Sequence, residues 1–113
     1  MVDAAVFAAI LDSLKAPVLF VDTDHVIRYM NRAAEAHYEE GRALIGRSVL
    51  DCHSECSRGV IVETLETFRA GEEERLITDN ERHRIFMRAV RAEDGEVIGY
   101  YERYAPPAPD EVS

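Results

Sequence analysis

The densest group of side chains with metal-binding or nucleophilic chemistry lies in one short segment, Asp51-Cys52-His53-Ser54-Glu55-Cys56. Its two thiols and one imidazole are ligand types that zinc and iron prefer. A closed zinc site needs four ligands, and the chain has no second cluster of cysteine and histidine. Structural zinc is therefore disfavoured, and Cys52, His53 and Cys56 are candidate metal ligands only.

The same two thiols could instead form a redox-sensitive pair. Cys52 and Cys56 are four positions apart, a spacing that is awkward for a disulfide inside a helix. The alternative is a buried, inert cysteine, the more common state of a free thiol. The sequence also has no Gly-rich phosphate loop, no G-x-S-x-G motif and no identifiable pair of catalytic acid and base. We therefore expect a protein that is not an enzyme.

The charge balance argues against two classes of partner. The 113-residue chain has 13 basic and 22 acidic residues, a formal net charge of −9, and such a field repels nucleic-acid phosphates and anionic lipids. The N-terminus lacks a basic region, and its apolar run is too short to span a bilayer. With only two cysteines, there is no disulfide framework of the secreted type. We expect a cytoplasmic protein that binds neither nucleic acid nor membrane.

The opening segment, residues 1–16, has the pattern of an amphipathic helix. Asp3 can cap it, Pro17 ends it, and its apolar side chains recur at helical spacing: Val6, Phe7, Ile10, Leu11 and Leu14. Alanines extend the apolar stripe around most of the helix, which favours contact on two sides. We therefore predict that this helix packs on its own domain and also forms a homodimer interface.

The rest of the chain predicts one α+β domain. Apolar, β-branched and aromatic runs indicate strands at 17–21, 25–30, 76–79, 83–91 and 97–104, with a two-residue hairpin turn at Asp94-Gly95. Between them, Asn31 can cap a helix that runs to Tyr38, and single helical turns follow. Ser57 can cap a longer helix that ends at Gly71. Because apolar side chains lie on both faces of strand 83–91, both faces of the sheet need cover.

Several short motifs occur in an order that is typical of one known family. They are Pro17-Val18-Leu19-Phe20-Val21-Asp22, Ile27, Tyr29, Asn31, Ala33-Ala34, Ile45-Gly46-Arg47 and Asp94-Gly95-Glu96-Val97-Ile98-Gly99-Tyr100. Together they resemble a PAS domain, the small sensory module of histidine kinases, cyclic-dinucleotide enzymes and transcription regulators. The sequence departs from the family at His25, where Gly is usual. It departs again after Tyr104, where prolines replace the usual junction to a signalling helix.

The resemblance implies a five-stranded antiparallel sheet, with short central helices on one face and the N-terminal helix on the other. The domain organisation that we expect is a dimerisation helix at 1–16, a PAS core at 17–104 and a disordered, Pro-rich tail at 105–113. The function expected is a sensory or signal-transduction module, which binds a small ligand in its core and signals through a dimer or a partner protein. The alternative is a structural dimerisation module without a ligand.

The resemblance and the strand alternation also predict which residues bind a ligand. The pocket candidates are Leu19, Val21, Leu44, Ile61, Leu65, Ile85 and Met87. Haem-binding relatives hold the iron with a His on the long central helix or on the short helix before it, and His53 falls in the second place. A haem-based gas or redox sensor is therefore a further alternative. Flavin is disfavoured, because Val49 occupies the position of the reactive Cys in light-sensing relatives.

Overall fold

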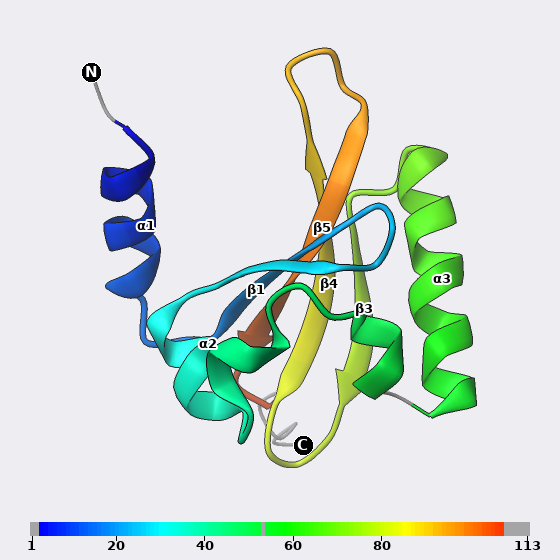
Figure 1. The fold of residues 1–113 in the computed structure, drawn as a ribbon. Coiled ribbons are helices and arrows are strands. Elements are labelled where there is room, and N and C mark those ends of the chain that lie inside the picture. The colour runs from blue at the N-terminus through cyan, green and yellow to red at the C-terminus, as the bar shows by residue number, and fades with distance from the viewer. Residues whose placement is uncertain (1–2, 53, 108–113) are drawn as a thin grey trace, which may run out of the picture.

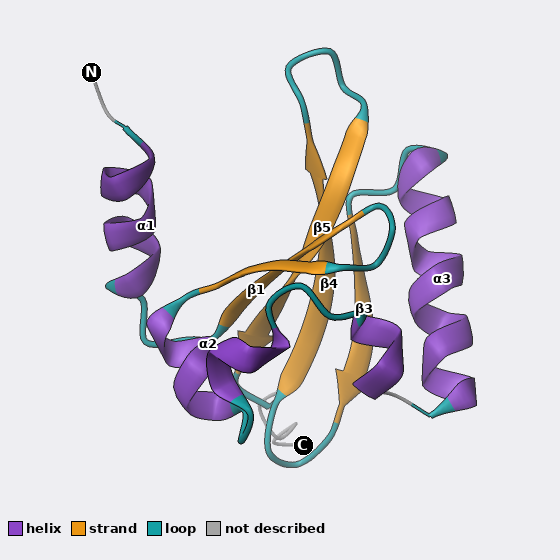
Figure 2. Ribbon diagram, in the orientation of Figure 1, coloured by secondary structure: helices purple, strands orange, loops and turns teal. Residues whose placement is uncertain are grey.

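The structure, a computed structural model, describes residues 3–52 and 54–107. A five-stranded antiparallel sheet in the order β2-β1-β5-β4-β3 forms its centre (Figures 1 and 2). The strands are β1 (Val18–Asp22), β2 (Ile27–Met30), β3 (Glu74–Asp79), β4 (Arg84–Arg91) and β5 (Val97–Ala105). This arrangement confirms the predicted α+β class, the first hairpin and the final three-stranded meander. The order places β5, the last strand, in the middle of the sheet.

Helices cover the inner face of the sheet. They are α2 (Arg32–His37), α3 (Glu55–Arg69) and two short 3₁₀ turns, η1 (Gly41–Leu44) and η2 (Val49–Cys52). From α3, four side chains are buried against the sheet: Ile61, Thr64, Leu65 and Phe68. They meet strand residues such as Val21 and Met87 in one continuous hydrophobic core. Burial of this apolar face is what stabilises α3 in place.

The long helix begins earlier than the sequence predicted. Its N-cap is Ser54 rather than Ser57, and the Ser54 Oγ accepts a hydrogen bond of 3.3 Å from the Ser57 N–H. Both serines can cap, but the earlier start lets Glu55 occupy the first turn, where a carboxylate complements the helix dipole.

The N-terminal helix, α1 (Ala4–Asp12), lies on the opposite side of the sheet from α3 (Figure 1). Asn31, fully buried, fixes its C-terminal end. The side-chain amide of Asn31 donates to the carbonyls of Leu11 (2.9 Å) and Ala16 (3.1 Å), and its oxygen accepts from the N–H groups of Val18 and Ala34. This one side chain therefore joins α1, β1 and α2.

The helix does not seal the outer face of the sheet as expected. None of its residues is buried, and Phe7 and Ile10 remain 57% and 54% exposed. Its second half contacts the rest of the domain, through the bonds from Asn31 and through the Tyr29 hydroxyl of β2, which lies 3.5 Å from the Ala8 carbonyl. None of the helices in the described residues is long and apolar enough to cross a membrane.

One turn differs from the sequence prediction, and a second has a left-handed residue that is not glycine. The loop between β4 and β5 is a three-residue hairpin rather than a two-residue one, because the Gly95 N–H bonds to the Ala92 carbonyl and Gly95 is left-handed at φ 88°. In the β1–β2 turn, His25 is also left-handed, at φ 64°. Its Nδ1 lies 2.8 Å from the buried Tyr100 hydroxyl, a contact that offsets the strain of this conformation.

Candidate functional site

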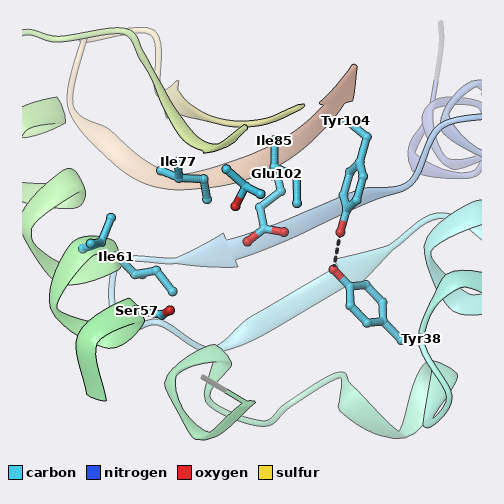
Figure 3. A pocket seen from close by; sticks show the side chains of 9 residues that line it. Tyr38, Ser57, Ile61, Ile77, Ile85, Glu102 and Tyr104 are labelled. Carbon is cyan, nitrogen blue, oxygen red and sulfur yellow. Dashed lines mark hydrogen bonds between the residues drawn. The ribbon is translucent and has the colours of Figure 1, made fainter. Parts of the chain in front are cut away.

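A pocket of about 270 Å³ lies between α3 and the inner face of β3, β4 and β5 (Figure 3). Nine side chains line it: Tyr38, Ser57, Val60, Ile61, Ile77, Thr78, Ile85, Glu102 and Tyr104. Helical and strand geometry explain why these residues meet. Ser57, Val60 and Ile61 share one face of α3 at i, i+3 and i+4, whereas Glu102 and Tyr104 are two apart on β5 and so point to the same face.

An irregularity in β3 adds two neighbouring side chains to the same wall. The pairing register between β3 and β4 shifts between Leu76 and Thr78. Neighbours in a regular strand point to opposite faces, but a bulge changes that alternation. Ile77 and Thr78 can therefore both line the pocket.

Glu102 is the charged side chain of this pocket. It is only 6% exposed and lies in the centre of the sheet, opposite Leu19 of β1 and Met87 of β4. In Figure 3 its carboxylate points into the space between the isoleucines and the two tyrosines. A carboxylate held among apolar walls is costly to bury unless it has polar partners. Glu102 has a polar interaction within the protein, and the remaining acceptor positions of its carboxylate make it a candidate ligand-binding group.

Two tyrosines form the polar end of the pocket. The hydroxyls of Tyr38 and Tyr104 are 2.8 Å apart, which joins the end of α2 to β5 (Figure 3). The rings of His37 and His83 pack against Tyr104 at 5.1 and 5.5 Å and fix its orientation. Burial and the charge of Glu102 raise the pKa of Tyr104 above its ordinary value, partly offset by the hydrogen bond to Tyr38. Tyr104 is therefore a neutral hydroxyl at physiological pH.

The predicted pocket residues fall into two groups. Ile61 and Ile85 line the pocket. The others, Leu19, Val21, Leu44, Leu65 and Met87, are buried in the hydrophobic core next to it. Three polar side chains of the pocket were not among the residues predicted from the sequence: Glu102, Tyr38 and Tyr104. For two of them a signal exists, because Tyr100, Glu102 and Tyr104 alternate with Tyr101 and Arg103 along the last strand.

The cysteine and histidine segment is only partly described. Cys56 is exposed on the first turn of α3, not buried as the inert alternative expected, because it precedes the helical positions that face the sheet. The side chain of Cys52 and all of His53 lie outside the described residues. Within the part of the chain that the structure describes, no three His, Cys, Asp or Glu side chains could hold a metal ion together.

The described part of the pocket offers no support for haem binding. Its volume of about 270 Å³ is below the lower end of drug-sized sites, roughly 300 Å³. None of the described residues that line it is a histidine or a cysteine, and a carboxylate occupies its centre.

A second, apolar groove lies on the outer face of the sheet. It has a volume of about 480 Å³ and is lined by Leu11 and Leu14 from the end of α1 and by Val18, Phe20, Tyr29 and Tyr101 from the sheet. The predicted dimer residues of α1 lie beside it. Val6, Phe7, Ile10 and Leu14 are each more than 40% exposed, and Leu11 is half-buried. The groove and the exposed stripe form a continuous apolar surface.

Residues 11–107 match the PAS fold family, and the chain belongs to it. PAS domains are non-catalytic modules typical of sensory and signalling proteins. The fold is similar to the C-terminal domain of a Streptococcus mutans protein, with a TM-score of 0.76 and 21% identity over 93% of this chain and 85% of that one. No curated protein sequence matches the chain.

Two further similar structures come from sensor proteins. One is a sensory box sensor histidine kinase from Vibrio cholerae, with a TM-score of 0.64 and 16% identity over 94% of this chain and 92% of that one. The other is the PAS domain of BvgS from Bordetella pertussis, also with a TM-score of 0.64 and 16% identity, over 93% and 86%. These similarities show a shared fold.

Proposed function

We propose that this PAS domain is a sensory module whose inner pocket binds a small ligand. The observation that carries the proposal is the pocket itself: a space of about 270 Å³ with aliphatic walls from α3, β3 and β4, one buried carboxylate and two hydrogen-bonded tyrosines. Apolar walls with a few convergent polar groups are the usual composition of a small-molecule site. A domain that only mediates dimerisation needs no such polar groups in its core.

The same strand offers a route for the signal. Glu102 faces the pocket, whereas its neighbour Tyr101 faces the outer groove beside Leu11 of α1 and Leu14, which follows the helix. A ligand that binds one arrangement of β5 more tightly shifts the population toward that arrangement. Because Tyr101 moves with β5, the packing of α1 changes with it.

The experiment is a thermal-unfolding screen of small polar and apolar molecules with a pocket-filling variant. Ser57 is exposed at the helical wall of the pocket, so Ser57→Phe fills the space without removing a core side chain. The matched control is Val62→Phe, an exposed α3 position that does not line the pocket. A ligand at one hundred times its Kd adds about 2.7 kcal/mol of stability, which raises Tm by roughly 10 °C in a domain of this size.

We expect such a ligand to stabilise the wild type and Val62→Phe but not Ser57→Phe. Equal stabilisation of all three proteins would place binding elsewhere and overturn the proposal.

A second candidate function, structural dimerisation, is favoured by the exposed apolar stripe of α1. A solvent-exposed row that includes Phe7 and Ile10 (57% and 54% exposed), next to an apolar groove, is typical of a surface that is covered in an assembly. The occupant we propose is a second copy of this chain, because its own α1 carries the complementary apolar residues. This interface also serves the sensory proposal, since it is where the signal would be read.

A further inference from the structure

We propose that the inner pocket selects small ligands in which an apolar body carries a positively charged nitrogen, bound by the carboxylate of Glu102. This inference rests on the proposed function and adds the chemical class of the ligand. It is carried by the identity of the pocket's polar groups rather than by the fold.

The carboxylate of Glu102 lies where a bound ligand would meet it. Glu102 is 6% exposed, and its carboxylate points into the pocket among Ile61, Ile77 and Ile85 (Figure 3). Glu102 already has a polar interaction within the protein, but a carboxylate offers about four acceptor positions. It can therefore accept hydrogen bonds from a ligand in addition. In such surroundings a charge-assisted hydrogen bond is about twice as strong as a neutral one.

The other side chains that line the pocket also favour a cation over an anion. Among the described residues that line the pocket, the charged side chain is the carboxylate of Glu102, which repels an anionic ligand and attracts a cationic one. Tyr38 and Tyr104 add aromatic rings, whose faces attract cations. The formal net charge of −9 of the whole chain also favours the approach of a cation over that of an anion.

The volume of the pocket limits the size of the ligand. A cavity of about 150 Å³ holds benzene, and drug-sized ligands need roughly 300 Å³ or more. The pocket, at about 270 Å³, lies between these limits. A single ring or a branched alkyl chain with one amino group therefore matches its volume, whereas a nucleotide or a fatty acid does not.

The test compares three probes of almost equal shape: benzylamine, its neutral analogue benzyl alcohol, and the anion benzoate. Binding is followed by the methyl NMR signals of the isoleucines in the full chain. Ile61, Ile77 and Ile85 line the pocket, and Ile98, on the exposed part of β5, serves as the internal reference. We expect benzylamine to shift the three pocket methyls with an affinity at least tenfold higher than that of benzyl alcohol, and benzoate to be the weakest.

The Glu102→Gln variant then tests the residue. It keeps the size of the side chain and removes its charge. We expect the preference for benzylamine over benzyl alcohol to fall to less than threefold, while benzyl alcohol binds as it does to the wild type. The comparison of the three probes on the wild type does not depend on the folding of this variant.

The outcomes separate this inference from the proposed function. If the amine and the alcohol shift the pocket methyls with equal affinity, or if benzoate binds best, the pocket binds ligands but the proposed selectivity is wrong. If Glu102→Gln folds and keeps the preference for benzylamine, another group recognises the nitrogen and the role of Glu102 is overturned. If no probe shifts the pocket methyls up to its solubility limit, both the inference and the pocket proposal fail.

Discussion

Glu102 and Tyr101 are neighbours on β5, yet they belong to opposite faces of the sheet and to different sites. Glu102 lies in the inner pocket, and Tyr101 lies in the outer groove beside the end of α1. A change in the β5 backbone at one of these sites also changes the other site, because consecutive strand residues share one backbone. The strand is also central in the sheet, paired with β1 on one side and β4 on the other.

The first prediction concerns the attachment of α1. Asn31→Asp keeps the two bonds that the side-chain oxygen accepts, but it places a second oxygen against the carbonyls of Leu11 and Ala16. Two partly buried acceptors then lose their donor and face an oxygen instead, at about 1–3 kcal/mol each. We expect a loss of about 3 kcal/mol in the free energy of unfolding, measured by urea denaturation, and faster amide exchange in α1.

The matched control for that variant is Asn80→Asp. Asn80 is exposed, and its side-chain oxygen only accepts hydrogen bonds, from the N–H groups of Arg82 and His83. An aspartate can do the same, so stability should change by less than about 0.5 kcal/mol. Equal losses for the two variants would show that Asn31 has no special part in holding α1.

The second prediction concerns the approach of β1 to β5. A Cβ at Gly99 would collide with the carbonyl oxygen of Val21 and lie 2.7 Å from the ring of Phe20. Gly99→Ala must therefore push the two strands apart, at about 1–3 kcal/mol. Gly59→Ala is the comparison, because its Cβ meets no atom within 4 Å and it lies inside α3. That variant should gain roughly 0.5–1 kcal/mol from helix propensity, as measured by the shift of the urea midpoint.

The third prediction is a pH dependence of stability. Burial and the charge of Arg69 lower the pKa of His25 below its ordinary 6.5, although Asp22, Asp24 and Glu66 oppose them. The unfolded chain therefore binds a proton more readily than the native protein. Stability from this residue is complete above about pH 6.5 and is lost as the pH falls through the native pKa.

Substitution of His25 by asparagine tests that assignment. Asparagine tolerates the left-handed backbone at this position, and its side chain does not titrate. In urea denaturation between about pH 7.5 and 5, the wild type should lose more stability than the variant. Parallel curves for the two proteins would mean that His25 contributes nothing to the acid sensitivity.

The fourth prediction tests the dimer. Ile10→Glu places a charge in the exposed stripe of α1, at a side chain that is 54% exposed. Light scattering should show a dimer for the wild type and a monomer for Ile10→Glu, with unchanged thermal stability of the monomer. The control is Val62→Glu, at an exposed position of α3, and this variant should remain dimeric. A wild type that stays monomeric at high concentration contradicts the proposed interface.

The α+β class and most element positions followed from the sequence because they depend on local patterns. Alternation along β1, β4 and β5, the cap at Asn31 and the apolar spacing of α3 are all visible in the residue order. The choice between Ser54 and Ser57 as cap was not, since the two residue types are equivalent. Nor was the left-handed His25, which is stabilised by Tyr100, a residue 75 positions away.

The polar part of the pocket was harder to predict for a related reason. Glutamate in a strand is usually solvent-exposed, so alternation alone does not suggest that Glu102 is buried. Its burial depends on β5 becoming the central strand, with β1 and β4 on either side. Similarly, Tyr38 reaches Tyr104 only after α2 folds over the sheet. These contacts are tertiary, and no spacing within one segment contains them.

The most direct test of the account is a methyl NMR titration of the wild-type chain with benzylamine, read at both sites. The pocket is reported by Ile61, Ile77 and Ile85, and the outer groove by Leu11 of α1 and Leu14, which follows the helix. We predict that both sets of signals shift with the same midpoint, while Ile98 stays constant. Pocket signals that shift while the α1 signals stay fixed would contradict the connection through β5, and pocket signals that do not move would contradict ligand binding.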